Sequence, residues 1–361
     1  MSAENLKAEI ARRYGTPAVV IDLEIVERNI ARAQALCDAA GVAFRPHIKT
    51  HKSPALAQMQ RSAGAAGITC QKIGEAEVMA EGGLDEILIA YNILGEEKLG
   101  RLGKLLARAH ITVAADNPVT IQGLPEAAKI AGRALDVVVE CDTGRKRAGV
   151  ETPGEAIELA GTIAATPGLT FAGFMFYPPD KGMATSQTFL NEAIAGVRAL
   201  GLDPRVVSSG GTPNLAQIDR LDGVTEHRAG TYIFNDRMMM QHGMATLDDC
   251  ALHVYATVVS RAGAERGVLD SGSKTLTVDT GGGLDGFGLI REYPQARIAG
   301  FAEEHGLLDL QRSNDRPPVG TVVRIVPNHV CVVVNMVDRL IAVRGDEIVG
   351  ELPVAARGKI S

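Results

Sequence analysis

The feature that most constrains the fold is a regular alternation of short apolar runs and longer amphipathic stretches between residues 18 and 240. The run TPAVVIDL (16–23) is typical of a strand, and residues 24–41 follow it with apolar positions at mostly helical spacing and a terminal glycine. Eight more apolar runs follow, with helix-like segments between most of them: VAFRPHIK, GITCQKI, EILIAYNI, ITVAAD, LDVVVECD, LTFAGFMFY, DPRVVSSGG and GVTEHRAG. This repeated βα unit predicts an α/β fold built on a (β/α)8 barrel of the TIM type, with an open doubly wound sheet as the alternative.

The pattern changes after about residue 245. The later runs are rich in β-branched residues and are broken by Gly, Pro and tight-turn pairs, which predicts strands. One helix is expected among them, at PQARIAGFAEEHG (294–306). We therefore predict a barrel at 18–243 and a C-terminal β domain at 244–361, with residues 1–17 packed on either domain.

Composition indicates a globular protein and excludes several classes. Hydrophobic residues make up 46% of the chain and charged residues 22%, as in folded soluble domains. No apolar run approaches the roughly 18 residues that span a bilayer, and the N-terminal stretch lacks the apolar centre of a signal peptide. The cysteines are widely spaced without a CxxC pair, which suits reduced thiols. We expect a cytoplasmic protein that binds neither nucleic acid nor membranes.

A dense basic cluster, RPHIKTHK (45–52), stands out in a chain of net charge −6. Active-site residues of barrels follow the C-terminal ends of the strands, and Lys49 falls at such an edge. The basic side chains around Lys49 disfavour its protonation, so its amine becomes the better nucleophile that Schiff-base chemistry requires. From spacing alone, a solvated basic loop is an equally good interpretation.

Two glycine-containing loops, SSGGTPN (208–214) and RAGTYIFND (228–236), follow late strands of the predicted barrel. Backbone N–H groups in such loops bind phosphate, although either loop taken alone is more often a simple turn. A Schiff-base lysine on an early strand and phosphate loops on late strands form the layout that holds pyridoxal phosphate by its two ends.

These motifs occur together with ECDTGRKRAGV (140–150) and PNHVCVVVN (327–335), in an order that resembles the fold-type III pyridoxal-phosphate enzymes over nearly the full length. Their alanine-racemase-like barrel carries the cofactor lysine on its first strand. Within them the chain is most similar to the branch of D-threonine aldolases and D-serine dehydratases.

The resemblance implies that Lys49 is the catalytic lysine that binds the cofactor. It places Arg147 near the cofactor's phenolic oxygen, Tyr177 against the pyridine ring as a further catalytic residue, and Arg228 near the pyridine nitrogen. The other cofactor contacts it implies are Gln71, Ser209, Gly210, Gly211, Thr212, Gly230, Thr231 and Tyr232.

A metal site is predicted in VPNHVCVVVN (326–335). In a strand, His329 and Cys331 at positions i and i+2 point the same way. One imidazole and one thiolate suit Zn²⁺ and leave positions open for water and substrate, although an isolated pair of this kind is more often core packing. The resemblance implies that both residues bind a divalent metal (Zn, Mn or Mg), and that the His-x-Cys form is more like zinc-dependent dehydratases.

The activity implied is a pyridoxal-phosphate- and metal-dependent lyase that cleaves D-3-hydroxy amino acids into glycine and an aldehyde. The aldolase is favoured because the loops at 70–83 and 140–150 look most like bacterial D-threonine aldolases. Dehydration of D-serine or D-threo-3-hydroxyaspartate to a 2-oxo acid and ammonia uses the same residues and stays open. A racemase and a non-catalytic pyridoxal-phosphate-binding protein are further alternatives.

Three expectations complete the sequence-based account. The general base is a metal-bound hydroxide, His51 or Lys49. The loop DTGGGLDGFG (279–288) is interpreted as flexible rather than as a nucleotide-binding loop, because its glycines do not precede a helix. The family implies a homodimer acting on a small D-amino acid.

Overall fold

The structure is a computed structural model of the 361-residue chain and describes residues 3–179, 182–261 and 263–361. The chain forms two compact units. The first, here called the barrel unit, consists of Ala31–Lys49, Pro54–Gly230 and Gly358–Ser361. The second, here called the β unit, consists of Met1–Ile30, Thr50–Ser53 and Thr231–Arg357.

In its described residues the barrel unit contains an eight-stranded parallel sheet in the order β2-β9-β8-β7-β6-β5-β4-β3. A parallel bridge between His47 and Thr69 joins the two end strands, and the Thr69 N–H donates to the Pro46 carbonyl at 2.8 Å, so the sheet closes. The predicted TIM-type barrel is confirmed. Its strands are β2 (Ala43–Phe44), β3 (Ile68–Cys70), β4 (Glu86–Ile89), β5 (His110–Ala115), β6 (Leu135–Cys141), β7 (Leu169–Phe176), β8 (Val206–Gly210) and β9 (Glu226–Arg228).

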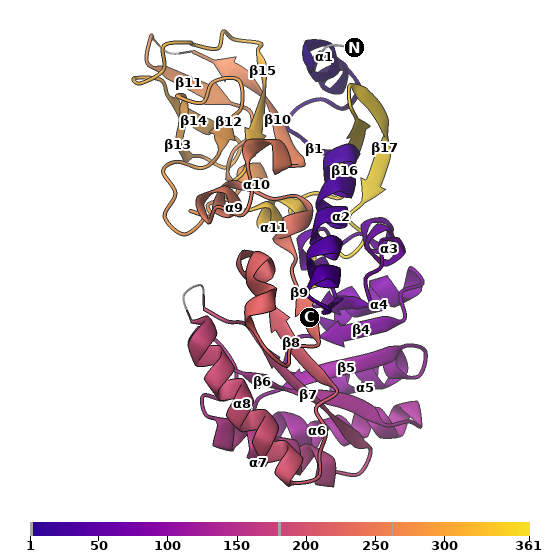
Figure 1. The fold of residues 1–361 in the computed structure, drawn as a ribbon. Helices are drawn as coiled ribbons and strands as arrows, with labels where there is room; N and C mark the ends of the chain where they lie inside the picture. The colour runs from indigo at the N-terminus through magenta and orange to yellow at the C-terminus, as the bar shows by residue number, and fades with distance from the viewer. Residues whose placement is uncertain (1–2, 180–181, 262) are drawn as a thin grey trace. The chain divides into compact units, whose positions relative to one another are not determined.

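Helices connect these strands and lie on the outside of the sheet, as α5 to α8 show in Figure 1. The N-termini of α6 and α7 carry side-chain caps: Asn117 accepts the Thr120 N–H, and Thr152 forms a capping box with Glu155. The helices are α3 (Pro54–Ser62), α4 (Ile73–Glu81), α5 (Glu96–Leu106), α6 (Pro118–Ala131), α7 (Pro153–Ala165) and α8 (Met183–Ala199), with 3₁₀ segments η1 (Ile48–Thr50) and η2 (Thr212–Arg220).

The β unit contains a nine-stranded mixed sheet within the described residues, in the order β11-β14-β13-β12-β15-β10-β1-β16-β17. Its strands are β1 (Ala18–Asp22), β10 (Leu252–Ser260), β11 (Arg266–Leu269), β12 (Leu289–Ile290), β13 (Arg297–Phe301), β14 (Gly306–Asp309), β15 (Val322–Val326), β16 (Arg339–Arg344) and β17 (Glu347–Pro353). The helical segments are α1 (Ala3–Tyr14), the start of α2 (Leu23–Ala39), η3 (Thr231–Ile233), α9 (Arg237–Gln241), η4 (Leu247–Asp249), α10 (Ser273–Leu276) and α11 (Val330–Val334).

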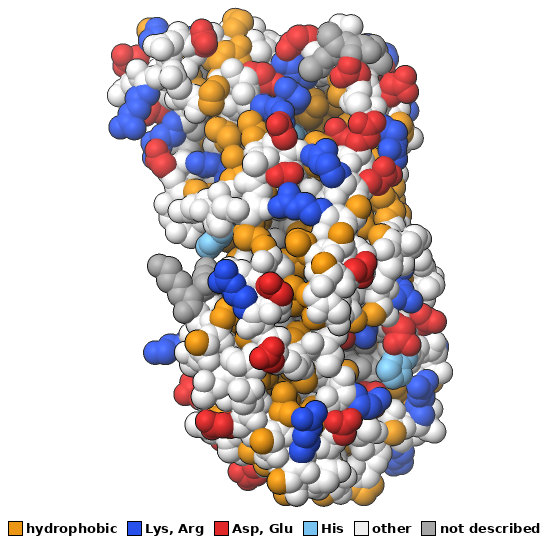
Figure 2. Space-filling view, viewed as in Figure 1, with side chains coloured by type: hydrophobic (Ala, Val, Ile, Leu, Met, Phe, Trp, Pro, Cys, Tyr) orange, Lys and Arg blue, Asp and Glu red, His pale blue; other side chains and the backbone are white. Residues whose placement is uncertain are grey.

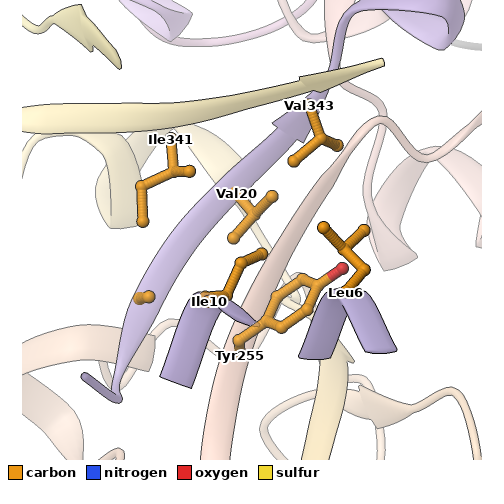
Figure 3. Close-up of a cluster of buried hydrophobic side chains, with 7 residues drawn as sticks. Leu6, Ile10, Val20, Tyr255, Ile341 and Val343 are labelled. Carbon is orange, nitrogen blue, oxygen red and sulfur yellow. The ribbon is translucent and has the colours of Figure 1, made fainter. Parts of the chain in front are cut away.

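Helix α1 covers part of this sheet through a small apolar core (Figure 3). Leu6 and Ile10 on the helix pack with Val20 on β1, Tyr255 on β10 and Ile341 on β16. These side chains are at most 5% exposed, and burying each aliphatic one contributes about 1.5–3 kcal/mol. The N-terminal segment thereby belongs to the β unit.

Two sequence-based expectations differ from the structure. The strand predicted at 16–23 forms, but it is β1, which pairs with β10 and β16 in the β unit. Residues 231–243 also belong to the β unit. The predicted domain boundaries, 18–243 and 244–361, therefore do not coincide with the two compact units. An apolar run predicts a strand without naming its partner. The helix predicted at 294–306 is instead the hairpin β13–β14, in which the Ala302 N–H donates to the His305 carbonyl.

The surface carries charges of both signs. On the face that Figure 2 shows, Lys and Arg side chains are interspersed with Asp and Glu. Among the described residues, the helices are all too short or too polar to cross a bilayer.

A buried histidine on β10 makes the stability of the β unit sensitive to acid. Burial, followed by the charges of Arg291 and Arg324, lowers the pKa of His253 to about 3. The unfolded chain therefore binds a proton that the folded chain excludes, so stability is lost as the pH falls below the ordinary histidine value of 6.5.

We expect His253 to account for about 1–2 kcal/mol of lost stability between pH 7 and pH 5. The His253→Gln variant should show a smaller drop than the wild type in urea unfolding at the two pH values. Equal drops in both proteins would contradict this assignment.

Candidate active site

The predicted site residues of the barrel unit follow the C-terminal ends of its strands. Lys49 lies on η1 after β2, Gln71 follows β3, Tyr177 follows β7 and Gly211 follows β8. The C-terminal strand ends of a parallel barrel converge at one mouth. Side chains that are far apart in the sequence therefore lie in one region of the structure. Lys49 is half-buried there, and its backbone N–H lies 3.5 Å from the His47 Nδ1.

His47 lies in a positively charged environment at the mouth of the barrel. Burial, then the charges of Lys49 and Arg228, and more weakly that of Arg147, hold the pKa of His47 well below its usual range. Its Nε2 lies 3.2 Å from the Gln71 Oε1, and the Gln71 amide donates to the Ala90 carbonyl at 2.8 Å. The structure thus brings together four predicted cofactor residues: Lys49, Gln71, Arg147 and Arg228.

Arg228 is buried and held by a polar network. Its guanidinium donates to the carbonyl and hydroxyl of Ser208 and, at 3.0 Å, to the Phe176 carbonyl. The Ser208 hydroxyl donates to Glu226 at 2.6 Å, and Arg45 donates to the other oxygen of that carboxylate at 2.8 Å. Burial lowers the pKa of Arg228 to about 10, with Glu226 opposing the shift, so the guanidinium stays charged at neutral pH.

Ser208 and Glu226 were not predicted as site residues. Both lie inside predicted strands, and a single sequence does not show which strand residues face a buried arginine. The charged pattern EHR (226–228) in an otherwise apolar run was the available signal.

Gly211 and Tyr177 lie in direct contact. Gly211 has φ +101°, and a Cβ added to it would overlap the Tyr177 ring. Arg145 lies over the same ring at 3.8 Å from its centroid, and Arg147 lies 5.6 Å away. Arg147 is mostly exposed and lies 3.7 Å from Glu140, a buried carboxylate whose pKa is raised by burial. Tyr177 is therefore fixed between a glycine and two guanidinium groups.

Gly211→Ala tests this contact. We expect a loss of about 1–3 kcal/mol from overpacking and a further cost from the positive φ, with displacement of Tyr177. Gly201→Ala is the matched control, because Gly201 has φ +76° but nothing within 4 Å of an added Cβ. Chemical denaturation should therefore show a larger loss for Gly211→Ala, and equal losses would contradict the contact.

The remaining predicted cofactor residues are divided between the units. Ser209, Gly210 and Thr212 are buried in the barrel unit beside Gly211, and Gly230 ends the segment after β9. Thr231 and Tyr232 belong to the β unit, where the Thr231 hydroxyl lies 3.9 Å from the Cys331 Sγ. The Thr50 hydroxyl lies 3.2 Å from the same sulfur.

The structure brings His329 and Cys331 together, but not on a strand as predicted. β15 ends at Val326, before Pro327 and Asn328, and His329 is the N-cap of the short helix α11 that contains Cys331. The run of valines predicts a strand because valine is β-branched. In the structure the Asp236 carboxylate accepts the Val330 N–H at 3.1 Å and stabilises a helical turn instead.

Asp279 fixes the orientation of His329. Its carboxylate lies 2.8 Å from the His329 Nδ1, and the His329 ring also forms a hydrogen bond with Cys331. Burial opposes protonation of the ring, but hydrogen bonds to Cys331 and Asp279 outweigh it and raise the pKa of His329 to about 10. From the sequence alone, residues 279–288 are interpreted as a flexible loop. The sequence contains no signal that links Asp279 to His329.

His51 is fully buried in the β unit, and its Nδ1 accepts the Ser53 N–H at 3.1 Å. Because Nδ1 accepts this hydrogen bond, the His51 ring carries a proton on Nε2. This geometry does not choose among the predicted general bases, which are a metal-bound hydroxide, His51 and Lys49.

The residues fit the two groups that the resemblance implies. For pyridoxal phosphate the barrel unit offers the Lys49 amine, the Tyr177 ring, the buried Arg228 cation and the glycine loop at 210–211. For a metal ion, a carboxylate-oriented imidazole facing a thiol is a suitable pair of ligands for Zn²⁺. In the described part of the chain, His, Cys, Asp and Glu side chains form no metal-binding group of three or more.

Comparisons with known proteins agree with this geometry. The family model "Alanine racemase, N-terminal domain" matches residues 21–238, and "Putative serine dehydratase domain" matches residues 251–343. The chain is 33% identical to a D-threonine aldolase from Arthrobacter sp, over 96% of this chain and 93% of the relative. It is 35% identical to a D-threo-3-hydroxyaspartate dehydratase from Delftia sp. (strain HT23), over 88% and 90% of the two chains.

Solved structures extend the comparison. The crystal structure of a D-threonine aldolase from Filomicrobium marinum matches with a TM-score of 0.88 at 33% identity, covering 96% of both chains. Structures of a D-threo-3-hydroxyaspartate dehydratase match with a TM-score of 0.85 at 31% identity, and they include a histidine-to-alanine mutant and a cysteine-to-alanine mutant in the metal-free form, at positions two residues apart.

The chain belongs to the fold-type III family of pyridoxal-phosphate enzymes. Its relatives lie in the branch that contains D-threonine aldolases and D-threo-3-hydroxyaspartate dehydratases, as the motifs predicted.

Proposed function

We propose that the protein is a pyridoxal-phosphate- and divalent-metal-dependent lyase that cleaves D-3-hydroxy amino acids into glycine and an aldehyde. The observation that carries the proposal is the pairing of His329 with Cys331 beside Thr50. Thr50 is joined to Lys49 by a peptide bond, and consecutive Cα atoms are about 3.8 Å apart. The residue that contacts the proposed metal pair is therefore the direct sequence neighbour of the proposed cofactor lysine.

The barrel residues have separate tasks in this proposal. Lys49 binds the cofactor aldehyde and moves the proton at the substrate Cα, Tyr177 orients the ring, and Arg228 contacts the pyridine nitrogen. When bound, pyridoxal phosphate supplies an electron sink for charge that develops at Cα. A charged Arg228 does not donate a proton to the ring, so the sink is weaker than one with a protonated nitrogen.

His329 and Cys331 hold the divalent ion, for which Zn²⁺ suits the thiol better than Mn²⁺ or Mg²⁺. A divalent ion held by these two residues would lower the pKa of the substrate β-hydroxyl or assist its departure. In the aldolase outcome a base takes the hydroxyl proton and the aldehyde forms as the Cα–Cβ bond breaks. The electron pair of that bond stays at Cα until Lys49 returns a proton there, which gives glycine.

A dehydratase is the second candidate, because solved structures of a D-threo-3-hydroxyaspartate dehydratase carry a histidine and a cysteine mutated at the same spacing as His329 and Cys331. In this outcome Lys49 removes the α-proton and the β-hydroxyl leaves as water, and hydrolysis of the released enamine by water gives a 2-oxo acid and ammonia.

Product analysis separates the candidates. The purified protein with pyridoxal phosphate and Zn²⁺ would be incubated with D-threonine and with D-threo-3-hydroxyaspartate. Glycine with an aldehyde supports the aldolase, and a 2-oxo acid with ammonia supports the dehydratase. Epimerisation without either product would indicate a racemase, and no reaction with any D-3-hydroxy amino acid would reject the lyase.

We also propose that the protein acts as a cytoplasmic homodimer. None of the five cysteines, all of which lie in the described residues, forms a disulfide, which suits a reducing compartment. Light scattering of the purified protein checks the dimer, and a monomeric mass would reject it.

A further inference from the structure

His227 on β9 is a buried polar residue to which the proposed function gives no task. Its neighbours Glu226 and Arg228 join the network described above, while its own ring lies 3.2 Å from the Gly211 carbonyl through Nε2. A carbonyl oxygen only accepts hydrogen bonds, so Nε2 must carry the ring proton.

Packing alone does not explain this histidine. The ring is fully buried, and within the described residues its Nδ1 has no hydrogen-bond partner. A buried polar atom without a partner is unfavourable, so an apolar side chain would be the more stable filler. Burial, then the adjacent Arg228 charge, lowers the pKa of His227 to about 3, so the ring stays neutral and keeps its Nε2–H near neutral pH.

The hydrogen bond from His227 fixes one peptide plane in the glycine loop. The Gly211 carbonyl also accepts the Asn214 N–H at 3.1 Å, and the Gly211 N–H donates to the Arg228 carbonyl at 2.7 Å. In a planar trans peptide, the carbonyl of one residue and the N–H of the next point in opposite directions. A Gly211 carbonyl held by His227 therefore directs the Thr212 N–H away from β9.

We propose that His227 is a positioning residue for the cofactor phosphate: its Nε2–H fixes the Gly211–Thr212 peptide so that the Thr212 N–H is presented to the phosphate group. The inference rests on the proposed pyridoxal-phosphate site. It assigns His227 an effect on the phosphate end of the cofactor and none on the aldehyde end at Lys49.

The test compares two forms of the cofactor. Binding of pyridoxal phosphate and of pyridoxal, which lacks the phosphate, would be titrated by absorbance into the apo forms of the wild type, His227→Leu and His227→Gln. Loss of one hydrogen bond in the loop should weaken pyridoxal phosphate binding by about tenfold in His227→Leu. Pyridoxal binding should change less than twofold, and His227→Gln, whose amide N–H can replace Nε2–H, should stay near the wild type.

His253→Leu is the matched control, since it removes another buried histidine with a strongly lowered pKa, and this histidine lies in the β unit. It should leave the ratio of the two affinities unchanged. Equal weakening of both ligands in His227→Leu, or no weakening, would overturn the inference while leaving the proposed function intact. A wild type that binds neither ligand would overturn the proposed function, and the inference with it.

If His227→Leu does not fold, His227→Asn replaces it. Its shorter amide places the N–H near the Nδ1 position, from which it does not reach the Gly211 carbonyl. A lower phosphate preference in His227→Asn than in His227→Gln supports the role of Nε2–H, and equal preferences overturn it.

Discussion

Replacing Lys49 with alanine is expected to abolish both lyase turnover and the visible absorbance of bound pyridoxal phosphate. Lys49 is the amine at the barrel mouth beside His47, Arg228 and Arg147, and it is the proposed point of covalent attachment. Losing its proton-transfer role alone should slow turnover by roughly 10²- to 10⁴-fold. Absorbance spectra and product formation measure the two effects.

Two variants make this result specific. Lys49→Arg keeps a positive charge but cannot form a Schiff base, so it should also lose the absorbance band. Lys104→Ala removes an exposed lysine on α5 and should change neither quantity. A Lys49→Ala protein that keeps the wild-type spectrum would show that the cofactor is attached elsewhere or not at all.

Removing the metal pair is expected to stop turnover without releasing the cofactor. His329 and Cys331 belong to the β unit, whereas Lys49, Gly211 and Arg228 belong to the barrel unit. A bound metal supplies several kcal/mol of transition-state stabilisation, so Cys331→Ala or His329→Ala should slow turnover by about 10³-fold. The zinc content should fall while the absorbance of bound pyridoxal phosphate remains.

Cys250→Ala is the matched control, because Cys250 is also a thiol of the β unit. It is buried and donates a hydrogen bond to the Thr246 carbonyl. It should keep both zinc and activity. Asp279→Asn should lower metal affinity by about 10- to 100-fold, so that added zinc restores activity. Full activity of Cys331→Ala after chelation would exclude the metal from the reaction.

The barrel could be predicted from the sequence because each of its strands is a short apolar run followed in most cases by an amphipathic helix. The partners of β1 could not be predicted in this way. Val20 is buried and lies in an ordinary apolar run, and its pairing with His253 and Ile341 depends on residues far along the chain. The hairpin at 297–309 was mistaken for a helix because its apolar spacing suits both structures.

The site could be predicted in part. Lys49, Arg228 and Gly211 stand in motifs with unusual charge or glycine content, and the structure places them at the strand ends of the barrel. Asp279 and Ser208 stand in unremarkable sequence, and their importance comes from what they contact in three dimensions. The His329 and Cys331 pair was predicted with the wrong secondary structure, since two residues two apart can meet at a helix start as well as on a strand.

The pairing of β1 also constrains the order in which the chain acquires its structure. Val20 on β1 pairs with His253 on β10 and with Ile341 on β16. Strand β1 therefore stays unpaired during synthesis until β10 and β16 have been made. Strands β2 to β9 are consecutive and pair mostly with their immediate successors, which keeps their loop-closure entropy low. The barrel can therefore form during synthesis, before the later strands of the nine-stranded sheet are present. Until then β1 is exposed, and a stalled chain would aggregate through this unpaired strand.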